Sequence, residues 1–226
     1  MNECVKDKFL NGKGSEKSDC FFLFLCQPEK LIMTYPEIRA KLAGKKVGIA
    51  GAGGLGSNCA AALVRSGIGS LVIADCDIVS DSNLNRQFYF RDQIGMKKTE
   101  ALALNLRRIN PGVALSMADV RLDPSNIGPL FSGCDVIVEA FDAADQKQML
   151  IETVLTDLPG IPLVIGLGMA GWGRSEEIRS TPYGMIHVCG DGVSEISDES
   201  PPLAPRVGIV ASMQANKTLE LLLCDV

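Results

Sequence analysis

The stretch that decides the fold is residues 47–58, which read VGIAGAGGLGSN. A short apolar run leads into Gly51, Gly53, Gly54 and Gly56, and small residues that favour the start of a helix follow. A strand, a tight glycine turn and a helix in this order bring backbone N–H groups close to a phosphate. The stretch therefore predicts a nucleotide-binding α/β domain, but it does not separate the pyrophosphate of a dinucleotide from the triphosphate of ATP.

The composition limits the classes of protein to consider. The chain has 226 residues, of which 46% are hydrophobic, and this is enough for one large domain with a substantial core. A net charge of -5 argues against nucleic-acid or membrane-surface partners. The eight cysteines include no C-x-x-C pair and are typical of small buried side chains in a reducing compartment. With no secretory signal and no apolar run long enough to span a bilayer, we expect a cytoplasmic protein.

Outward from the glycine turn, strand-like and helix-like patterns alternate. Apolar runs predict strands at residues 47–50, 71–74, 114–117, 136–138 and 162–168. Helical patterns lie at residues 54–66, 96–109, 124–130 and 143–157. Such alternation indicates crossover units, so the expected fold class is α/β: a Rossmann-like, mostly parallel sheet with helices on both faces.

The two ends of the chain differ from this pattern. Residues 1–34 form a polar N-terminal extension with one strand-like run at 21–25, and the nucleotide-binding domain is expected over 35–226. Pro36 suits the first turn of a short helix. After Gly171, polar strand-like pieces, a loop and a final helix at 206–223 predict a C-terminal extension of the sheet domain.

Four polar residues follow the second predicted strand in the stretch DCDIVSDSNLNRQ: Asp75, Asp77, Asn83 and Arg86. Because they come after the carboxyl end of a strand, their side chains can face a nucleotide crevice. Asp75 stands where a carboxylate binds ribose hydroxyls, in NAD and ATP sites alike. Arg86 offers the permanent positive charge that a triphosphate needs. The alternative is that Arg86 pairs with Asp77 or Asp81 on the surface.

In the helical stretch MKKTEALALNLRRIN, Lys98 shares one side with Leu102, Leu106 and Ile109. Lys97 points instead to the solvated side. A lysine that faces inward at the start of a core helix needs an anionic partner, such as a bound phosphate. The alternative is a lysine that snorkels outward from the helix end.

Asp142 ends the apolar stretch DVIVEAFD. It could cap a helix that begins at Ala143, or it could bind Mg²⁺ opposite a triphosphate, because hard cations take carboxylate oxygens. Together with Arg86 and Lys98, Asp142 favours the magnesium site.

The joint pattern GxGGLGS, DxDxVxxSNLNRQ, GMKKxEA, RINP and EAFD resembles the adenylating enzymes related to ubiquitin-activating enzymes. The resemblance is to the ThiF/MoeB/HesA family, and within it to the short bacterial ThiF type that adenylates the sulfur carrier protein ThiS. It covers roughly residues 42–223. The joint pattern is specific, whereas the glycine turn alone is not.

The resemblance implies ATP and Mg²⁺ as cofactors, with a ThiS-like carrier that ends in Gly-Gly as the partner. The carrier's C-terminal glycine carboxylate would attack the α-phosphorus of ATP to give an acyl-adenylate and pyrophosphate, in thiamine biosynthesis. The nucleotide site implied is Gly51, Gly53, Gly54, Gly56, Asp75, Asp77, Asn83, Arg86 and Lys98. Asp75 would hold the ribose, Asn83 and Arg86 the phosphates and Lys98 the reacting phosphate, while Asp142 would bind the metal.

The chain departs from the family pattern in three places. Around the metal carboxylate Asp142, Glu139 and Ala143 stand where relatives often show Asp and Asn. Many relatives hold zinc with two C-x-x-C pairs that this chain lacks, so no zinc is expected. Relatives also present an N-terminal arginine to a partner's site, but no arginine here precedes Arg39, so Lys30 or Arg206 could take that role. Some relatives form a covalent sulfur link through a cysteine. Cys189 is the candidate, with His187 on the same strand face, and the alternative is an inert buried thiol.

The C-terminal part suggests two further features. Val207, Val210, Met213 and residues 221–223 give the final helix more apolar surface than one sheet domain would bury, and with the family's habit of dimerising they predict a homodimer. The loop at 190–205 is rich in Ser, Asp and Pro, so it is expected to stay outside the sheet. We expect it to be mobile in the free enzyme and to guide the carrier's tail, and the alternative is a solvated linker with no role.

Other functions stay open at this point. Within the family, the substrate could be a MoaD-like carrier or, in the tRNA-modifying branch, an RNA, against which the acidic charge counts. An NAD-dependent oxidoreductase would need a general acid near the nicotinamide, yet the chain has one histidine and no Tyr-x-x-x-Lys. A catalytically silent docking module would have no use for Arg86, Lys98 and Asp142 together.

Overall fold

The structure is a computed structural model that describes residues 32–224. The chain is divided between Met33 and Thr34, and the second unit, from Thr34 onward, contains every helix and strand that the structure describes. The strand-like run at 21–25 and Lys30 lie outside the described residues.

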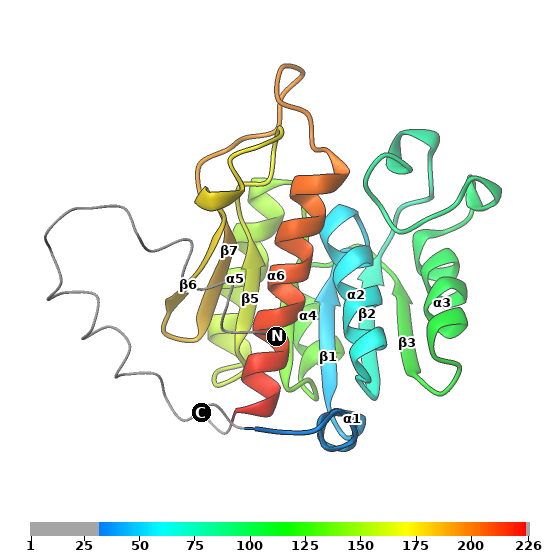
Figure 1. Ribbon diagram of the computed structural model, residues 1–226, viewed down its shortest axis with the longest axis vertical. Coiled ribbons are helices and arrows are strands. Elements are labelled where there is room, and N and C mark those ends of the chain that lie inside the picture. Colours follow the sequence, from blue (N-terminus) through cyan, green and yellow to red (C-terminus); the bar gives the residue numbers. More distant parts are fainter. Residues whose placement is uncertain (1–31, 225–226) are drawn as a thin grey trace, which may run out of the picture. The chain divides into compact units, whose positions relative to one another are not determined.

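A seven-stranded sheet forms the centre of the second unit, in the order β3-β2-β1-β4-β5-β7-β6 (Figure 1). Its strands are β1 (Lys46–Ala50), β2 (Ser70–Asp75), β3 (Ala114–Asp119), β4 (Val136–Glu139), β5 (Leu163–Gly166), β6 (Arg179–Tyr183) and β7 (Ile186–Gly190). All neighbouring strands are parallel except the pair of β6 and β7. The predicted α/β class with a mostly parallel sheet is confirmed.

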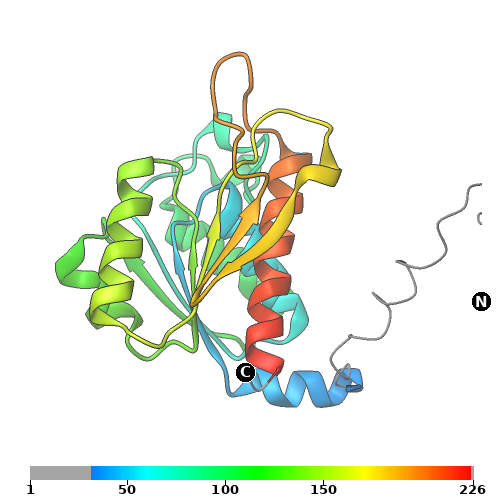
Figure 2. The ribbon, with the colours of Figure 1, turned by 90° about the vertical axis from the view of Figure 1, so that its left-hand side faces the viewer.

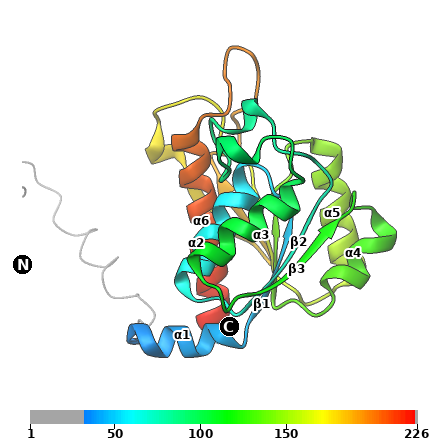
Figure 3. The ribbon, with the colours of Figure 1, turned by 90° about the vertical axis from the view of Figure 1, so that its right-hand side faces the viewer.

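Helices cover both faces of the sheet, as Figures 2 and 3 show. They are α1 (Tyr35–Ala43), α2 (Gly54–Ser66), α3 (Lys98–Ile109), α4 (Pro124–Phe131), α5 (Ala144–Asp157) and α6 (Ala204–Leu223). Helix α2 packs between α3 and α6 on one face, while α4 and α5 pack together on the other. This layering follows from the right-handed crossovers that join parallel strands.

Both faces of the sheet are buried, and this explains why its strands read as continuous apolar runs. In β1, Val47 and Ile49 belong to the core under α2 and α6. Ala50 belongs to the core under α4 and α5, because successive side chains of a strand point to opposite faces. Gly48 faces that second core too, where a Cβ would lie 2.6 Å from the ring of Phe131.

The glycine turn joins β1 to α2 and needs two of its glycines for backbone reasons. Gly51 has a φ of 100°, a conformation that other residues rarely adopt. At Gly56, a Cβ would lie 1.9 Å from the carbonyl oxygen of Gly51. Gly56 therefore lets the first turn of α2 pack directly on the turn that precedes it.

The structure contradicts the reasoning that led from α6 to a homodimer. Val207, Val210 and Leu222 are buried within the single chain, where α6 packs on α2 and on strands of the sheet. The loop before α6 does stay outside the sheet, as expected, apart from one bridge between Gly171 and Pro202. Among the helices formed by residues 32–224, none combines the length and the hydropathy needed to cross a membrane.

Candidate active site

A pocket of about 640 Å³ opens at the carboxyl ends of the strands, above the point where β1 and β4 are neighbours. The chain leaves these two strands in opposite directions along the sheet, and such a switch point is where α/β domains bind ligands. The pocket is lined by the glycine turn, by the ends of β2, β3 and β4, by the first turn of α5 and by parts of two later loops. Its volume lies in the range of pockets that bind small molecules, about 300–1,000 Å³.

Asp75, at the end of β2, is held against the glycine turn. One carboxylate oxygen accepts a hydrogen bond from the backbone N–H of Ala52 at 2.7 Å, and the other accepts one from the N–H of Asp77 at 2.8 Å. These bonds fix the carboxylate where it lines the pocket, and each oxygen keeps a lone pair for a hydroxyl donor.

Lys98 faces inward, as its helical spacing predicted. It is the first residue of α3, only 6% of its surface is exposed, and its Nζ lies 2.7 Å from the carboxylate of Asp77 at the pocket. Lys97 is exposed on the other side, where it pairs with Asp119. The two adjacent lysines thus have the different environments that the sequence indicated, and the snorkelling alternative is wrong.

Arg86 lines the pocket without a carboxylate partner in the part of the chain that the structure describes. Its guanidinium donates to the carbonyl oxygen of Ser82 at 3.2 Å and to Oδ1 of Asn85 at 2.8 Å. Asp81 pairs instead with Arg91. The surface ion pair considered for Arg86 is therefore not formed, and its charge can still be offered to an anion.

Two of the predicted nucleotide-site residues do not line the pocket. Asn83 closes a short 3-10 turn, in which its Oδ1 accepts a hydrogen bond from the N–H of Ser80 at 3.0 Å. Gly56 lies against Gly51, as described above. Both shape the segments that hold the site, so their expected contact with the nucleotide has no support in this geometry.

Asp142 is exposed and lines the pocket, but it does not cap a helix. Helix α5 begins one residue later than expected, at Ala144, and its N-cap residue Ala143 forms no side-chain cap. Within residues 32–224, no cluster of three or more His, Cys, Asp and Glu could hold a metal on its own. A single carboxylate beside the phosphates suits Mg²⁺, which commonly takes its remaining ligands from phosphate oxygens and water.

A buried ion pair that the sequence did not indicate lies at the end of β4. Glu139 is fully buried, and both of its carboxylate oxygens lie 2.9 Å from Nζ of Lys147, which also donates to the carbonyl oxygen of Gly166. Burial raises the pKa of Glu139, while Lys147 and the N–H of Phe141 act in the opposite direction. A carboxylate inside an apolar strand requires a cation, and Lys147 is the first one that follows in the chain.

Gln87 is a second pocket residue that sequence reasoning missed. It lines the pocket next to Arg86, and its buried Oε1 has no hydrogen-bond partner among the described residues. Nearby, the hydroxyl of Tyr89 donates to the carbonyl oxygen of Ala52 at 2.7 Å and so attaches this connection to the glycine turn. A buried acceptor without a partner is costly, so Gln87 is a candidate for binding a ligand donor.

Cys189 does not have the environment of a reactive thiol. It is completely buried, burial raises its pKa, and the hydrogen bond to Ser180 only partly offsets this. The pKa of His187 is itself lowered by burial and by Lys217. The reading in which His187 activates Cys189 is therefore wrong, and the buried-thiol alternative holds.

Arg206 does not reach into the pocket. It is buried beside Asp191, with which it forms an ion pair. The role that we considered for it, a cation presented to a nucleotide, is therefore not supported.

Comparisons with known proteins agree with this fold. The family model described as "ThiF family" matches residues 30–225. The SAMP-activating enzyme E1 of Haloferax volcanii is 32% identical over 195 residues, which are 83% of this chain and 71% of that protein. The adenylyltransferase and sulfurtransferase UBA4 of Yarrowia lipolytica is 29% identical, over 94% of this chain and 56% of its own length. The chain thus spans little more than half of this fungal relative.

Solved structures support the fold. The Escherichia coli tRNA N6-threonylcarbamoyladenosine dehydratase TcdA, in complex with ATP, matches with a TM-score of 0.75 at 23% identity, over 82% of this chain and 88% of that one. The E. coli protein MccB with ATP matches with a TM-score of 0.63 at 22% identity, over 82% and 57%.

Proposed function

The chain belongs to the ThiF family of adenylyltransferases, and we propose that it uses ATP to adenylate the C-terminal glycine carboxylate of a ubiquitin-like sulfur carrier protein. The observation that carries this proposal is the pair of cations, Arg86 and Lys98, at the pocket formed by the glycine turn. Two fixed charges suit a triphosphate, whereas a dinucleotide pyrophosphate is largely satisfied by the turn itself.

We assign a separate part of ATP to each group at the pocket. Asp75 would accept hydrogen bonds from the ribose hydroxyls, since its carboxylate is already oriented by the glycine turn. Backbone N–H groups near Gly53 and Gly54, at the start of α2, would bind phosphate oxygens, helped by the helix dipole. Arg86 and Lys98 would compensate the remaining negative charge.

The proposed reaction is attack of a glycine carboxylate oxygen on the α-phosphorus, with pyrophosphate as the leaving group. Such a transfer needs positioning and charge compensation rather than a nucleophilic side chain. Lys98 would exchange its contact with Asp77 for the phosphate, where the developing charge is greatest. Asp142 would hold Mg²⁺, which supplies further positive charge to the triphosphate when bound.

The carrier is proposed to be ThiS-like, which would place the enzyme in thiamine biosynthesis. The support is the resemblance of the motifs to the short ThiF type and the name of the archaeal relative, a SAMP-activating enzyme. A MoaD-like carrier is the nearest alternative. The structural neighbour TcdA acts on a tRNA nucleoside, but a net charge of -5 gives this chain little attraction for RNA.

ATP–pyrophosphate exchange tests the proposal directly. Exchange should require ATP, Mg²⁺ and a carrier that ends in Gly-Gly, and a ThiS-like carrier should support it better than a MoaD-like one. The same carrier without its final glycine is the control, and Arg86→Ala should abolish exchange. Absence of exchange with every Gly-Gly carrier, or calorimetry that shows tight NAD binding without ATP binding, would contradict the proposal.

A further inference from the structure

Two loops lie side by side above β5 and β7 (Figures 1 and 2). We name them by residue range: the β5–β6 loop at 167–178 and the β7–α6 loop at 191–203. The first contributes Met169 to the pocket lining, and the second contributes Ile196 and Pro202. These loops therefore form part of the wall of the site.

The loops are joined along their backbones at two separate points. Near their stems, the N–H groups of residues 191 and 192 donate to the carbonyl oxygens of residues 168 and 167 at 3.1 and 3.0 Å. Further out, the N–H of Gly171 donates to the carbonyl oxygen of Pro201 at 3.0 Å. The loops are therefore positioned as a pair.

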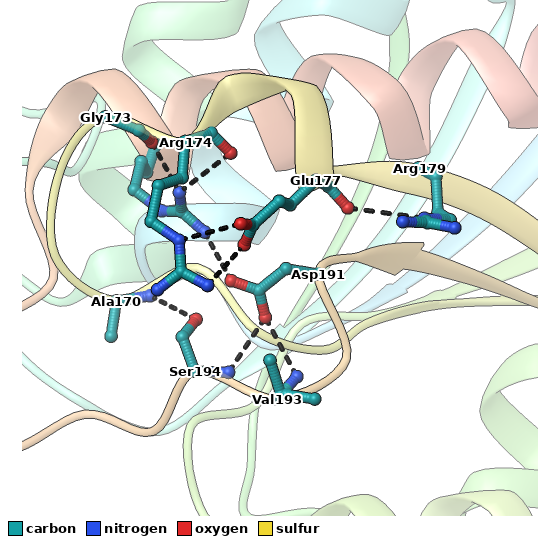
Figure 4. Close-up of polar contacts among 9 residues, drawn as sticks. Ala170, Gly173, Arg174, Glu177, Arg179, Asp191, Val193 and Ser194 are labelled. Carbon is teal, nitrogen blue, oxygen red and sulfur yellow. Dashed lines mark hydrogen bonds and ion pairs between the residues drawn. The ribbon is translucent and has the colours of Figure 1, made fainter.

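Asp191 organises the stem of the β7–α6 loop through its side chain (Figure 4). Oδ1 accepts hydrogen bonds from the N–H groups of Val193 at 2.9 Å and Ser194 at 2.8 Å. The hydroxyl oxygen of Ser194 in turn accepts one from the N–H of Ala170. Oδ2 forms the ion pair with Arg206.

Arg206 connects this stem to two further segments. It lies in the first turn of α6, and its NH1 group donates to the carbonyl oxygens of Gly173 at 2.5 Å and Arg174 at 3.3 Å. The side chains of Arg206 and Asp191 are only 4% and 3% exposed. One buried guanidinium thus joins both loops to α6, whose next residue, Val207, lines the pocket.

The pair is separate from the residues that would hold the nucleotide. Asp75 ends β2, Arg86 lies in the connection that follows, and Lys98 begins α3. None of them forms a hydrogen bond to either loop among the contacts of the described residues. A buried ion pair stabilises a fold little more than apolar side chains of the same volume would. Removing one partner, however, destabilises the fold strongly, because the other charge is left buried without a partner. Such a pair specifies one arrangement of the segments that it joins.

We propose that Asp191 and Arg206 are a positioning pair that holds the β7–α6 loop over the pocket, where the acyl substrate meets the nucleotide. This inference rests on the proposed function and adds to it the residues that set the acyl side of the site. With the pair intact, Ile196 and Pro202 confine the space beside the reacting phosphate. With one partner removed, the remaining charge draws water and the loop leaves its place.

The test compares Asp191→Asn and Arg206→Gln with the wild type. Each should raise the KM for a Gly-Gly carrier by about tenfold or more in pyrophosphate exchange. The Kd for ATP, measured by calorimetry, should stay within about twofold. Arg206→Lys keeps the charge and should restore part of the loss. Arg174→Gln is the matched control: it removes the exposed ion pair with Glu177 on the same loop and should change neither constant.

A second measurement needs no carrier and remains informative if the proposed function fails. A glutamate-specific protease should cut after Glu195 and Glu199 faster in Asp191→Asn than in the wild type, with the fragments identified by mass. A carrier KM and a cleavage rate that both match the wild type would overturn the positioning pair. Equal loss of ATP and carrier binding would also overturn it, since the pair would then only support the fold.

Discussion

At the scale of single residues, the position of each lysine side chain decides whether its charge lies at the pocket or in solvent. Lys97 and Lys98 are neighbours in the sequence, yet one is solvated beside Asp119 and the other is buried beside Asp77. Helical periodicity predicts this difference because it depends only on the angle between consecutive residues. The partner Asp77 could not be predicted with the same ease, since it belongs to another segment.

The first prediction uses this pair of lysines. Lys98→Ala should lower the rate of adenylation roughly a hundredfold or more, on the order of 3 kcal/mol, because it removes a charge that faces the reacting phosphate. Lys97→Ala removes an exposed pair and should change the rate by less than about twofold. Single-turnover formation of the acyl-adenylate measures both. Equal losses would show that Lys98 acts only through the fold.

The second prediction concerns His187, the one histidine of the chain. Burial and the nearby Lys217 lower its pKa in the folded state below the usual 6.5, while Glu220 acts weakly in the opposite direction. The unfolded chain therefore takes up the proton first, so the free energy of unfolding should fall as the pH drops through 6.5. His187→Gln should flatten this part of the curve, measured by urea unfolding between about pH 8 and pH 5. Parallel curves for the two proteins would contradict it.

The predicted positions of single residues agree with the structure where the signal was local. Asp75 and Lys98 follow from positions within one strand–turn–helix unit. The ion pairs of Glu139 with Lys147 and of Asp191 with Arg206 depend on how separate elements meet, so no local spacing indicates them. Arg206 is an example. From the sequence we considered it a free cation, but in the structure it is buried and forms an ion pair with Asp191.

At the scale of elements, hydrophobic pattern and glycine placement predicted β1 to β5 and the helices between them within a few residues. The later region was harder. The polar stretch at 173–188 forms two strands, Arg179–Tyr183 and Ile186–Gly190, which turn at Gly184 with a φ of 61°. That β7 pairs with β5 in parallel is a property of the whole sheet and has no marker in the sequence.

The third prediction concerns the packing of α2 on the glycine turn. Gly56→Ala places a methyl group against the backbone oxygen of Gly51, which cannot rotate away, so we expect a loss of stability of about 1–3 kcal/mol. At Gly128, inside α4, an added methyl group would meet no neighbouring atom within 4 Å, so Gly128→Ala should be neutral or stabilising by up to about 1 kcal/mol. Chemical denaturation of both variants measures the contrast. Similar changes in the two would mean that α2 can shift on the turn.

At the scale of the whole molecule, the exposed apolar side chains indicate where a second copy of the chain would bind. Val207, Val210 and Leu222 of helix α6 are buried within the chain, so these residues give no argument for a dimer through α6. A different apolar surface lies between β2 and α3, where Ile78, Phe90 and Ile94 are exposed. The backbone bonds of Val79 to Met96 and Gly95 hold this connection in a defined shape.

The last prediction is that the protein forms a homodimer through this surface. Symmetric dimers use one self-complementary patch on both partners. A stable dimer interface buries about 800 Å² on each partner. Three side chains supply less than this area, so we expect the rest of the connection between β2 and α3 to contribute to the interface. Light scattering should give twice the chain mass of 24.1 kDa. Phe90→Asp, which places a charge where the side chain is 45% exposed, should shift the mass to that of a monomer. Leu155→Asp, at a residue of α5 that is 51% exposed, is the control and should leave the dimer intact. A monomer mass for the wild type at micromolar concentration would contradict the dimer, whereas dissociation caused by Leu155→Asp alone would move the interface to the face covered by α5.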